Sequence, residues 1–469
     1  MNTITLTNDS SRALLLTGSL LILVVSLFVL LFWSQNAATL ELIYPGTALI
    51  IGGALYVARP SFYLGFCWWI GFITPFVRRL VDYQAGAFNP TNPIMLAPYL
   101  VCAISLITFF RLGGRLLNRR YFPFLLSLSG VVYGYLVGVA KAGVLSATFG
   151  VLEWILPVLM GLHVLLLWQD YPEHRRVVRS TYTWAVLVMS LYGIYQFANP
   201  PAWDALWLSE SGMVGSMGKP EPYRIRVFST MNAGGPFAVI MMTGLLVLFD
   251  GRGSVARIAT IPGYLSLMFT FVRNAWGGWF VGVLFLLKYL SGKARTRMIV
   301  LLLFALALAV PIALQGPGAE RLESRVGTLG NLEENGSFRA RVALYIRESP
   351  RVVTNVVGSG IGSYGNAAKL STGESVNLDS GLLAVPLTLG WLGTALYLGG
   401  LIWMLRNALR SWSLSVDRFA VICTAIVLAY SAMMIFGNQF VGFKGIIVWS
   451  FLGLALSSDA YHKEQPLYL

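Results

Sequence analysis

The chain has 469 residues, of which 56% are hydrophobic and only 12% charged, and its formal net charge is +14. This composition is far outside that of a soluble globular protein. It predicts a polytopic membrane protein.

Apolar segments recur along the whole chain, each close to the ~20 residues that a helix needs to span about 30 Å of hydrocarbon. Because a spanning segment must satisfy its own backbone hydrogen bonds, we expect these segments to be helices. The sequence therefore predicts one all-α transmembrane domain over residues 1–469 with about fourteen spans. The predicted spans are residues 13–33, 40–58, 61–77, 93–110, 121–139, 150–168, 180–198, 236–250, 258–272, 275–290, 298–314, 382–404, 419–437 and 445–458.

The distribution of Lys and Arg sets the expected orientation. These residues gather in alternate breaks between the spans, at 111–120, 174–179, 251–257 and 293–297. Such loops face the cytoplasm under the positive-inside rule. We therefore expect a multi-pass protein with both termini in the cytoplasm.

Two segments on the opposite, outer side are long: residues 199–235 and residues 315–381. Long loops usually carry function when they are not disordered. In the second loop, "SFRARVALYIRESPRVV" places Phe338, Val342 and Tyr345 at intervals of three to four residues, with arginines between them. This spacing predicts a short amphipathic helix on the outer surface.

Charged residues are expected to converge at the outer ends of the spans. The predicted span 258–272 runs outward and 275–290 runs back, so Arg273 lies at the mouth of a helical hairpin and not at the bilayer centre. The same reasoning places further charged residues on this side: Arg224, Arg226, Arg341, Asp379 and Lys444.

An arginine near a helix end can simply extend its charge to the lipid headgroups. For Arg226 and Arg273 a binding role is favoured, because small or polar residues flank both and allow close approach of a ligand. Guanidinium groups bind phosphate oxygens in pairs and keep their charge in a site of low dielectric constant. A diphosphate at the membrane surface is therefore the expected ligand.

Motifs for a catalytic metal or for nucleotide hydrolysis are absent from the sequence. It has no Walker motif and no HExxH, and "GSGIGSYG" at 358–365 lacks the Lys-Ser/Thr of a P-loop. We therefore expect no metal and no cofactor, so an enzyme at the outer face needs an activated substrate. Glu153, at the outer start of its span, either pairs with an arginine or interacts with the helix dipole.

Four stretches in the C-terminal half resemble the superfamily of O-antigen ligases and Wzy-type O-antigen polymerases, with the related exopolysaccharide polymerases. They fall between about residues 220 and 400, and the N-terminal half is similar only in having many spans. The four stretches are "RVFSTMNAGGPFA", "FTFVRNAWGGWFVG", "SFRARVALYIRESPRVVTNVVGSGIGSYG" and "DSGLLAVPLTLGWLG".

The resemblance implies a GT-C-like architecture in the bacterial inner membrane. It implies transfer of a glycan from a polyprenyl diphosphate carrier to an acceptor sugar at the periplasmic face, without metal or nucleotide. Arginines such as Arg226, Arg273 and Arg341 would bind the diphosphate and stabilise it as the leaving group. Further substrate-binding candidates are Arg224, Arg339, Lys444, Tyr345 and Glu153.

The implied partners are a lipid-linked donor, a lipid-linked acceptor and membrane lipid. A chain-length regulator and a flippase are candidate protein partners, and no nucleic acid is expected.

One departure from the family pattern favours a polymerase over a ligase. Ligases carry a His-Asn pair about ten residues before a Gly-x-x-Gly, whereas here Asp379 and Ser380 precede Gly390 and Gly393. Asp379 is then a candidate general base for the acceptor hydroxyl, or it orients a sugar or an arginine. Alternatively it caps the following helix, and both roles can hold together.

Two alternatives to a polymerase remain open. A ligase would transfer the glycan to a lipid acceptor of a different kind. A flippase of lipid-linked oligosaccharide could also have about fourteen spans and a cationic cavity, but such transporters commonly show two related halves and charges near the midplane.

Overall fold

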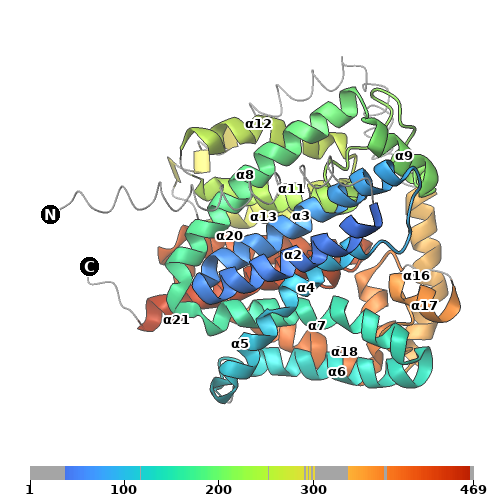
Figure 1. Cartoon of the computed structure of the whole chain (residues 1–469). Helices are drawn as coiled ribbons and strands as arrows, with labels where there is room; N and C mark the ends of the chain where they lie inside the picture. The colour runs from blue at the N-terminus through green and yellow to red at the C-terminus, as the bar shows by residue number, and fades with distance from the viewer. Residues whose placement is uncertain are drawn as a thin grey trace.

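The computed structural model describes residues 37–464, apart from 117, 252, 290, 291, 294, 297, 298, 301–335 and 374–377. Every regular element in this part of the chain is a helix, which confirms the predicted all-α class. The long helices lie side by side in a bundle (Figure 1). At one end of it gather α9 (Ala202–Glu210), α16 (Gly336–Thr354) and α17 (Lys369–Thr372).

The bundle is formed by α2 (Ala37–Ala58), α3 (Pro60–Ala85), α6 (Phe122–Ala142), α7 (Val144–Leu166), α8 (Tyr171–Ala198), α11 (Gly234–Val247), α12 (Ser254–Phe269), α13 (Arg273–Tyr289), α18 (Gly381–Leu409), α20 (Arg418–Met433) and α21 (Gly442–Glu464). One broken helix between α3 and α6 consists of η1 (Pro93–Leu96), α4 (Ala97–Ala103) and α5 (Ser105–Arg111). The short helices are η2 (Gly113–Arg115), η3 (Trp168–Asp170), α10 (Val214–Met217), η4 (Leu248–Asp250), η6 (Asn366–Ala368), α19 (Ser413–Val416) and η7 (Met434–Phe436).

Among the described residues, 8 helical stretches are long and apolar enough to cross a membrane. They are Thr39–Ala58, Pro60–Ala85, Pro93–Arg111, Phe122–Ala142, Val144–Leu166, Gly381–Leu409, Arg418–Phe436 and Gly442–Glu464. Each coincides with a predicted span, which supports a membrane protein.

The other predicted spans have two outcomes. Residues 180–198, 236–250, 258–272 and 275–290 are largely helical, in α8, α11 with η4, α12 and α13, but these helices are shorter or more polar. The predicted span 13–33 lies outside the described residues, as does 298–314 beyond residue 300. The count of about fourteen spans and the GT-C-like architecture therefore stay predictions.

The amphipathic helix predicted within the second long loop is present as α16, which covers Gly336–Thr354. Its apolar residues Val342, Ile346 and Val353 are exposed, and arginines alternate with them. The first outer loop also contains helices, α9 and α10, joined to α11 through a stretch of turns that includes an isolated antiparallel bridge between Gly218 and Ile225.

Glycines allow α7 and α21 to pack closely. A Cβ at Gly161 would lie 2.5 Å from the Trp449 carbonyl oxygen, and one at Gly453 would lie 2.4 Å from the Gly161 carbonyl oxygen. Membrane helices commonly approach one another at such small residues. The contact fixes the relative position of two helices that carry Glu153 and Lys444.

Ion pairs hold together the end of the bundle opposite α9 and α16. A guanidinium nitrogen of Arg175 lies 2.9 Å from an Asp250 oxygen, and another lies 3.2 Å from an Asp417 oxygen. Arg120 pairs with Glu464 at 2.5 Å. These contacts join segments that the charge bias assigns to one side of the membrane.

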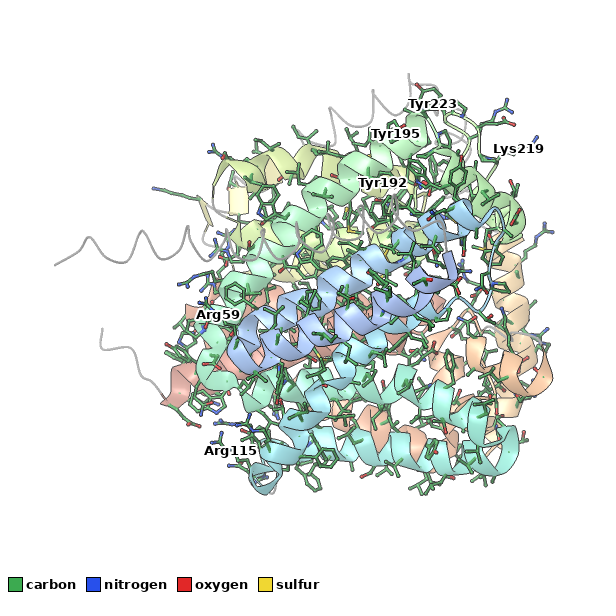
Figure 2. All side chains as sticks on the ribbon, viewed as in Figure 1. Arg59, Arg115, Tyr192, Tyr195, Lys219 and Tyr223 are labelled. Atoms are coloured by element: carbon green, nitrogen blue, oxygen red, sulfur yellow. The ribbon has the colours of Figure 1, made fainter. Side chains whose placement is uncertain are left out.

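Figure 2 shows Arg59 and Arg115 near this charged end, and Lys219 and Tyr223 at the other. The predicted grouping of the basic breaks is therefore supported. Their assignment to the cytoplasm stays a prediction that rests on the positive-inside rule.

A break in α18 receives the glycine-rich segment 358–365. Gly390 has φ 63° and ψ −171°, so the helical hydrogen bonds stop there. The freed carbonyls of Leu387 and Thr388 instead accept hydrogen bonds from the amides of Ser359 (2.8 Å) and Gly360 (2.9 Å). The break thereby places backbone of the long outer loop between helices of the bundle.

Replacement of Gly390 by alanine is expected to destabilise the protein by about 2 kcal/mol or more. Its φ and ψ are accessible mainly to glycine, and a Cβ there would lie 2.3 Å from the Val357 carbonyl carbon. Thermal unfolding of the purified protein in detergent measures the effect. Gly399→Ala is the matched control on the same helix, because the nearest neighbour of its Cβ would lie 3.8 Å away. Equal melting temperatures for the two variants would contradict this account.

Candidate functional site

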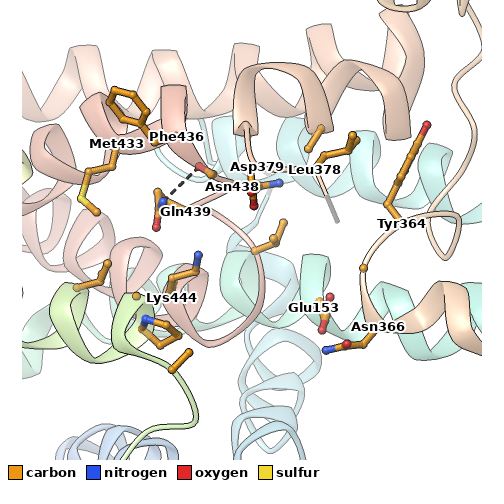
Figure 3. A pocket seen from close by; sticks show the side chains of 18 of the residues that line it. Glu153, Tyr364, Asn366, Leu378, Asp379, Met433, Phe436, Asn438, Gln439 and Lys444 are labelled. Atoms are coloured by element: carbon orange, nitrogen blue, oxygen red, sulfur yellow. Dashed lines mark hydrogen bonds between the residues drawn. The ribbon is translucent and has the colours of Figure 1, made fainter. Parts of the chain in front are cut away.

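A cavity of about 560 Å³ opens at the end of the bundle where α9 and α16 lie. Its walls come from α7, α10, α11, α13, α16, α18, the glycine-rich segment and the residues between α20 and α21. Its charged and amide side chains are Glu153, Arg226, Asn274, Arg341, Asn366, Asp379, Asn438, Gln439 and Lys444. Figure 3 shows many of them facing the same space.

The structure brings five of the predicted site residues together in the lining of this cavity: Glu153, Arg226, Arg341, Asp379 and Lys444. They are distant in sequence, and they belong to three helices, α7, α16 and α21, and two connecting segments. The expected convergence of cations and a carboxylate at one depth is therefore present in the structure.

Four other predicted residues are not part of the lining. Arg273 is the first residue of α13, directly before Asn274, which does line the cavity. Arg224 is largely exposed and pairs with Glu221 at 2.8 Å, and Arg339 is exposed on α16. Their roles in substrate binding stay predictions.

Tyr345, the fourth, joins α16 to the helices beside the cavity. Its hydroxyl lies 2.7 Å from the Ser380 Oγ and donates to the Ile435 carbonyl oxygen at 2.9 Å. Both contacts are to residues next to the cavity wall, so Tyr345 fixes the position of α16.

Arg226 is anchored on the turn between α12 and α13. Its Nε donates to the Thr270 carbonyl (3.1 Å), and its two Nη atoms donate to the carbonyls of Phe271 (3.1 Å) and Ser216 (3.2 Å). A cation at the carboxyl end of a helix is favoured by the helix dipole. These bonds fix the guanidinium at the cavity wall and link it to the hairpin that carries Arg273.

The backbone around Arg226 is strained. Three non-glycine residues of the described chain have positive φ values: Tyr223 (62°), Ser229 (50°) and Phe271 (53°). Each such residue costs of order 1–3 kcal/mol and persists only where its surroundings hold it. Two flank Arg226 in the sequence, and the third accepts its hydrogen bond.

A buried arginine holds part of this strained backbone in place. Arg79 of α3 is fully buried, and its Nε lies 3.0 Å from the Asp204 carboxylate. It also donates to the carbonyls of Ser229 (2.5 Å) and Met231. The loop that follows Arg226 is thus fastened to the core of the bundle.

Gln196 completes this support from α8. Its Oε1 accepts from the amides of Phe228 (3.1 Å) and Ser229 (2.8 Å), and its Nε2 donates to Asp204 at 2.5 Å. The sequence analysis did not predict this network. Arg79 within an apolar span could have indicated it, because ionisable residues inside spans are rare and mostly functional.

Arg341 enters the cavity from α16. Its guanidinium carbon lies 5.3 Å from the centre of the Phe436 ring, a cation–π distance. Its Nε is buried and has no hydrogen-bond partner among the described residues. The guanidinium group as a whole lines the cavity and can bind an anionic ligand there.

Asp379 is not the cap of the helix that follows it. Ser380 is the N-cap of α18, and its Oγ accepts from the Leu383 amide at 3.3 Å. The carboxylate of Asp379 is exposed and lines the cavity. The alternative role of Asp379 as a cap is therefore wrong, and a role toward a ligand remains.

Lys444 interacts electrostatically with Asp379 and Glu153. Neither carboxylate comes close enough to it for an ion pair in the part of the chain that the structure describes. Lys444 thus lines the cavity without direct contact to either carboxylate, and all three side chains can bind a polar ligand there. The cavity can therefore bind an anion at its arginines and hydroxyl groups at its carboxylates.

Breaking the buried pair behind Arg226 is expected to be far more costly than breaking an exposed one. Asp204→Asn leaves the charge of Arg79 buried and uncompensated, a loss of about 3–5 kcal/mol. Glu221→Gln, which removes the exposed partner of Arg224, is expected to cost less than about 1 kcal/mol. Thermal unfolding in detergent compares them, and similar losses would show that the network does not hold the loop.

A comparison with models of known protein families finds none that matches this chain, and a search of curated proteins finds no significant match. Its chemistry must therefore be argued from the residues that line the cavity.

Proposed function

We propose that this chain is a membrane glycosyltransferase that joins polyprenyl-diphosphate-linked oligosaccharide units into a polysaccharide. The observation that carries the proposal is the meeting of Arg226, Arg341 and Lys444 with Asp379 in one cavity at the end of an apolar helical bundle. The resemblance of residues from about 220 to 400 to O-antigen ligases and polymerases points to the same chemistry.

The diphosphate of the donor binds to Arg226 and Arg341. Arg226 is fixed by three carbonyl groups before any ligand arrives, and the Arg341 guanidinium lines the same cavity. Charges fixed in advance stabilise a developing anion without the cost of reorganisation. Arg273, beside the turn that holds Arg226, adds positive charge to the same region.

The reaction is a substitution at the anomeric carbon of the donor. The acceptor hydroxyl oxygen forms a bond to this carbon, and the bond from carbon to the diphosphate oxygen breaks. The diphosphate leaves with the electron pair, and the hydroxyl proton passes to the carboxylate of Asp379. No metal and no cofactor takes part in this scheme.

Apolar side chains beside the arginines accommodate the start of the prenyl chain. Met213, Met217, Val239, Val272 and Met433 line this part of the cavity. Methionine side chains adapt their shape to an irregular apolar ligand. The lipid and the diphosphate can thus bind to neighbouring parts of one cavity.

The membrane setting follows from the charge bias. The cavity lies at the end opposite the basic segments, which under the positive-inside rule supports a position at the outer face. The resemblance implies that this face is the periplasmic face of a bacterial inner membrane. About fourteen spans and a GT-C-like arrangement are part of the proposal. Protein partners of the same pathway are a flippase and a chain-length regulator.

A polymerase is favoured over a ligase because Asp379 and Ser380 occupy the places of the His-Asn pair of ligases. A flippase is less consistent with the arrangement of charges. Transporters bind substrate near the membrane midplane, whereas the cavity that Arg226, Arg341 and Lys444 line lies at one end of the bundle.

Removal of either cavity arginine is expected to abolish most polymer formation. Arg226→Ala and Arg341→Ala should each lower the rate by about 10²–10³-fold, because a fixed donor to the leaving group is lost. The assay incubates the purified protein with synthetic polyprenyl-diphosphate repeat units and resolves the products as a ladder.

Arg347→Ala is the matched control, since Arg347 lies on α16 like Arg341 but is largely exposed and pairs with Glu348. A single transfer product would favour a ligase. Unchanged ladders in both cavity variants, or translocation without any joining, would overturn the proposal.

Asp379→Asn and Ser380→Ala are expected to separate catalysis from helix capping. Asp379→Asn should reduce transfer strongly and leave the melting temperature unchanged, because Asp379 does not cap α18. Ser380→Ala should lower stability by about 1 kcal/mol, because it removes the cap. Full transfer activity in Asp379→Asn would remove the base assignment.

A further inference from the structure

Some residues that line the cavity carry no positive charge and have no role in the diphosphate site proposed above. Glu153 of α7 lies beside Asn366 (Figure 3), and Tyr364 of the same loop as Asn366 also lines the cavity, with its hydroxyl directed away from Glu153. No described residue donates a hydrogen bond or forms an ion pair with the Glu153 carboxylate or the Asn366 amide. An unpartnered carboxylate and amide at a cavity wall are free to bind a ligand.

The backbone that carries Tyr364 and Asn366 is pinned to α7. The Ser146 hydroxyl lies 2.8 Å from the Gly362 carbonyl oxygen and 2.7 Å from the Ala367 carbonyl oxygen. Ser146 lies on α7, two helical turns before Glu153. The backbone that carries the three side chains is therefore held in place before a ligand binds.

Gly365 keeps the carboxylate open to the cavity. Its φ is 75°, and a Cβ at this position would lie 3.9 Å from the Glu153 Oε2. A larger side chain would cover the carboxylate, and L-residues rarely adopt this φ. The glycine thus preserves both the turn and access to Glu153.

We infer that Glu153, Tyr364 and Asn366 form the subsite for the acceptor, and that they bind its terminal sugar as a neutral, hydroxyl-rich ring. This inference rests on the proposed function. A carboxylate accepts hydrogen bonds from two sugar hydroxyls, and an amide both donates and accepts. The tyrosine ring offers an apolar face to the sugar C–H groups. A uronic acid is disfavoured at this place, because its carboxyl group and that of Glu153 cannot both be ionised in close contact.

The inference assigns different charge preferences to different residues of one cavity. Arg226 and Arg341 bind the anionic donor, and Glu153 binds an uncharged acceptor. Because Asp379 and Glu153 line the same cavity, an acceptor hydroxyl would meet the donor beside Asp379.

The test varies the acceptor and the donor separately in the transfer assay with the full chain. Glu153→Gln is expected to raise the KM for a neutral acceptor by about tenfold or more, because a hydrogen bond to a charged group is weakened. Its donor KM and melting temperature should stay unchanged. Glu153→Asp should recover part of the affinity, and Glu221→Gln on the same face is the control.

Discrimination between acceptors gives a second readout. The unaltered protein should reject an acceptor that ends in a uronic acid, and Glu153→Gln should accept it more readily. An unchanged acceptor KM in Glu153→Gln, or an equal loss for the donor, would overturn the inference while leaving the proposed function intact.

Absence of any transfer by the unaltered protein would instead count against the proposed function. Calorimetric binding of a soluble neutral oligosaccharide then tests the subsite by itself. The binding should be lost in Glu153→Gln, and equal binding by both proteins would overturn the inference.

Discussion

The arrangement of the cavity depends on how an arginine is held at the edge of an apolar bundle. A guanidinium removed from water needs partners that replace its hydration. Arg226 finds them in the carbonyls of Thr270, Phe271 and Ser216, which carry no net charge. These three contacts fix the guanidinium at the wall of the cavity that it lines.

Arg79 has a carboxylate partner in addition to backbone carbonyls. It is paired with Asp204 and donates to backbone carbonyls, so its charge is neutralised inside the bundle. Its effect reaches the cavity only through the loop that contains Ser229, whose strained φ it helps to maintain. One buried arginine thus supports the backbone, and another lines the cavity.

Much of the helical layout could be predicted from the sequence, because apolar length and the Lys/Arg bias act locally. The amphipathic α16 and the meeting of Arg226, Arg341, Asp379 and Lys444 followed from the same reasoning. The break of α18 at Gly390 could not be predicted. Nor could the hydrogen bond from the Ser359 amide to the Leu387 carbonyl, because it joins segments about thirty residues apart. The sequence also could not predict that Ser380 caps α18, because Asp and Ser are both preferred at a helix N-cap and Asp379 is the adjacent residue.

The central claim is that Arg226 and Arg341 bind one diphosphate between them. The most direct measurement is a cryo-electron microscopy structure of the full chain in lipid nanodiscs with a non-transferable polyprenyl diphosphate sugar. The account predicts diphosphate density within hydrogen-bond distance of both guanidinium groups, with the sugar directed toward Asp379. Density for the diphosphate elsewhere on the protein, with this cavity empty, would contradict it.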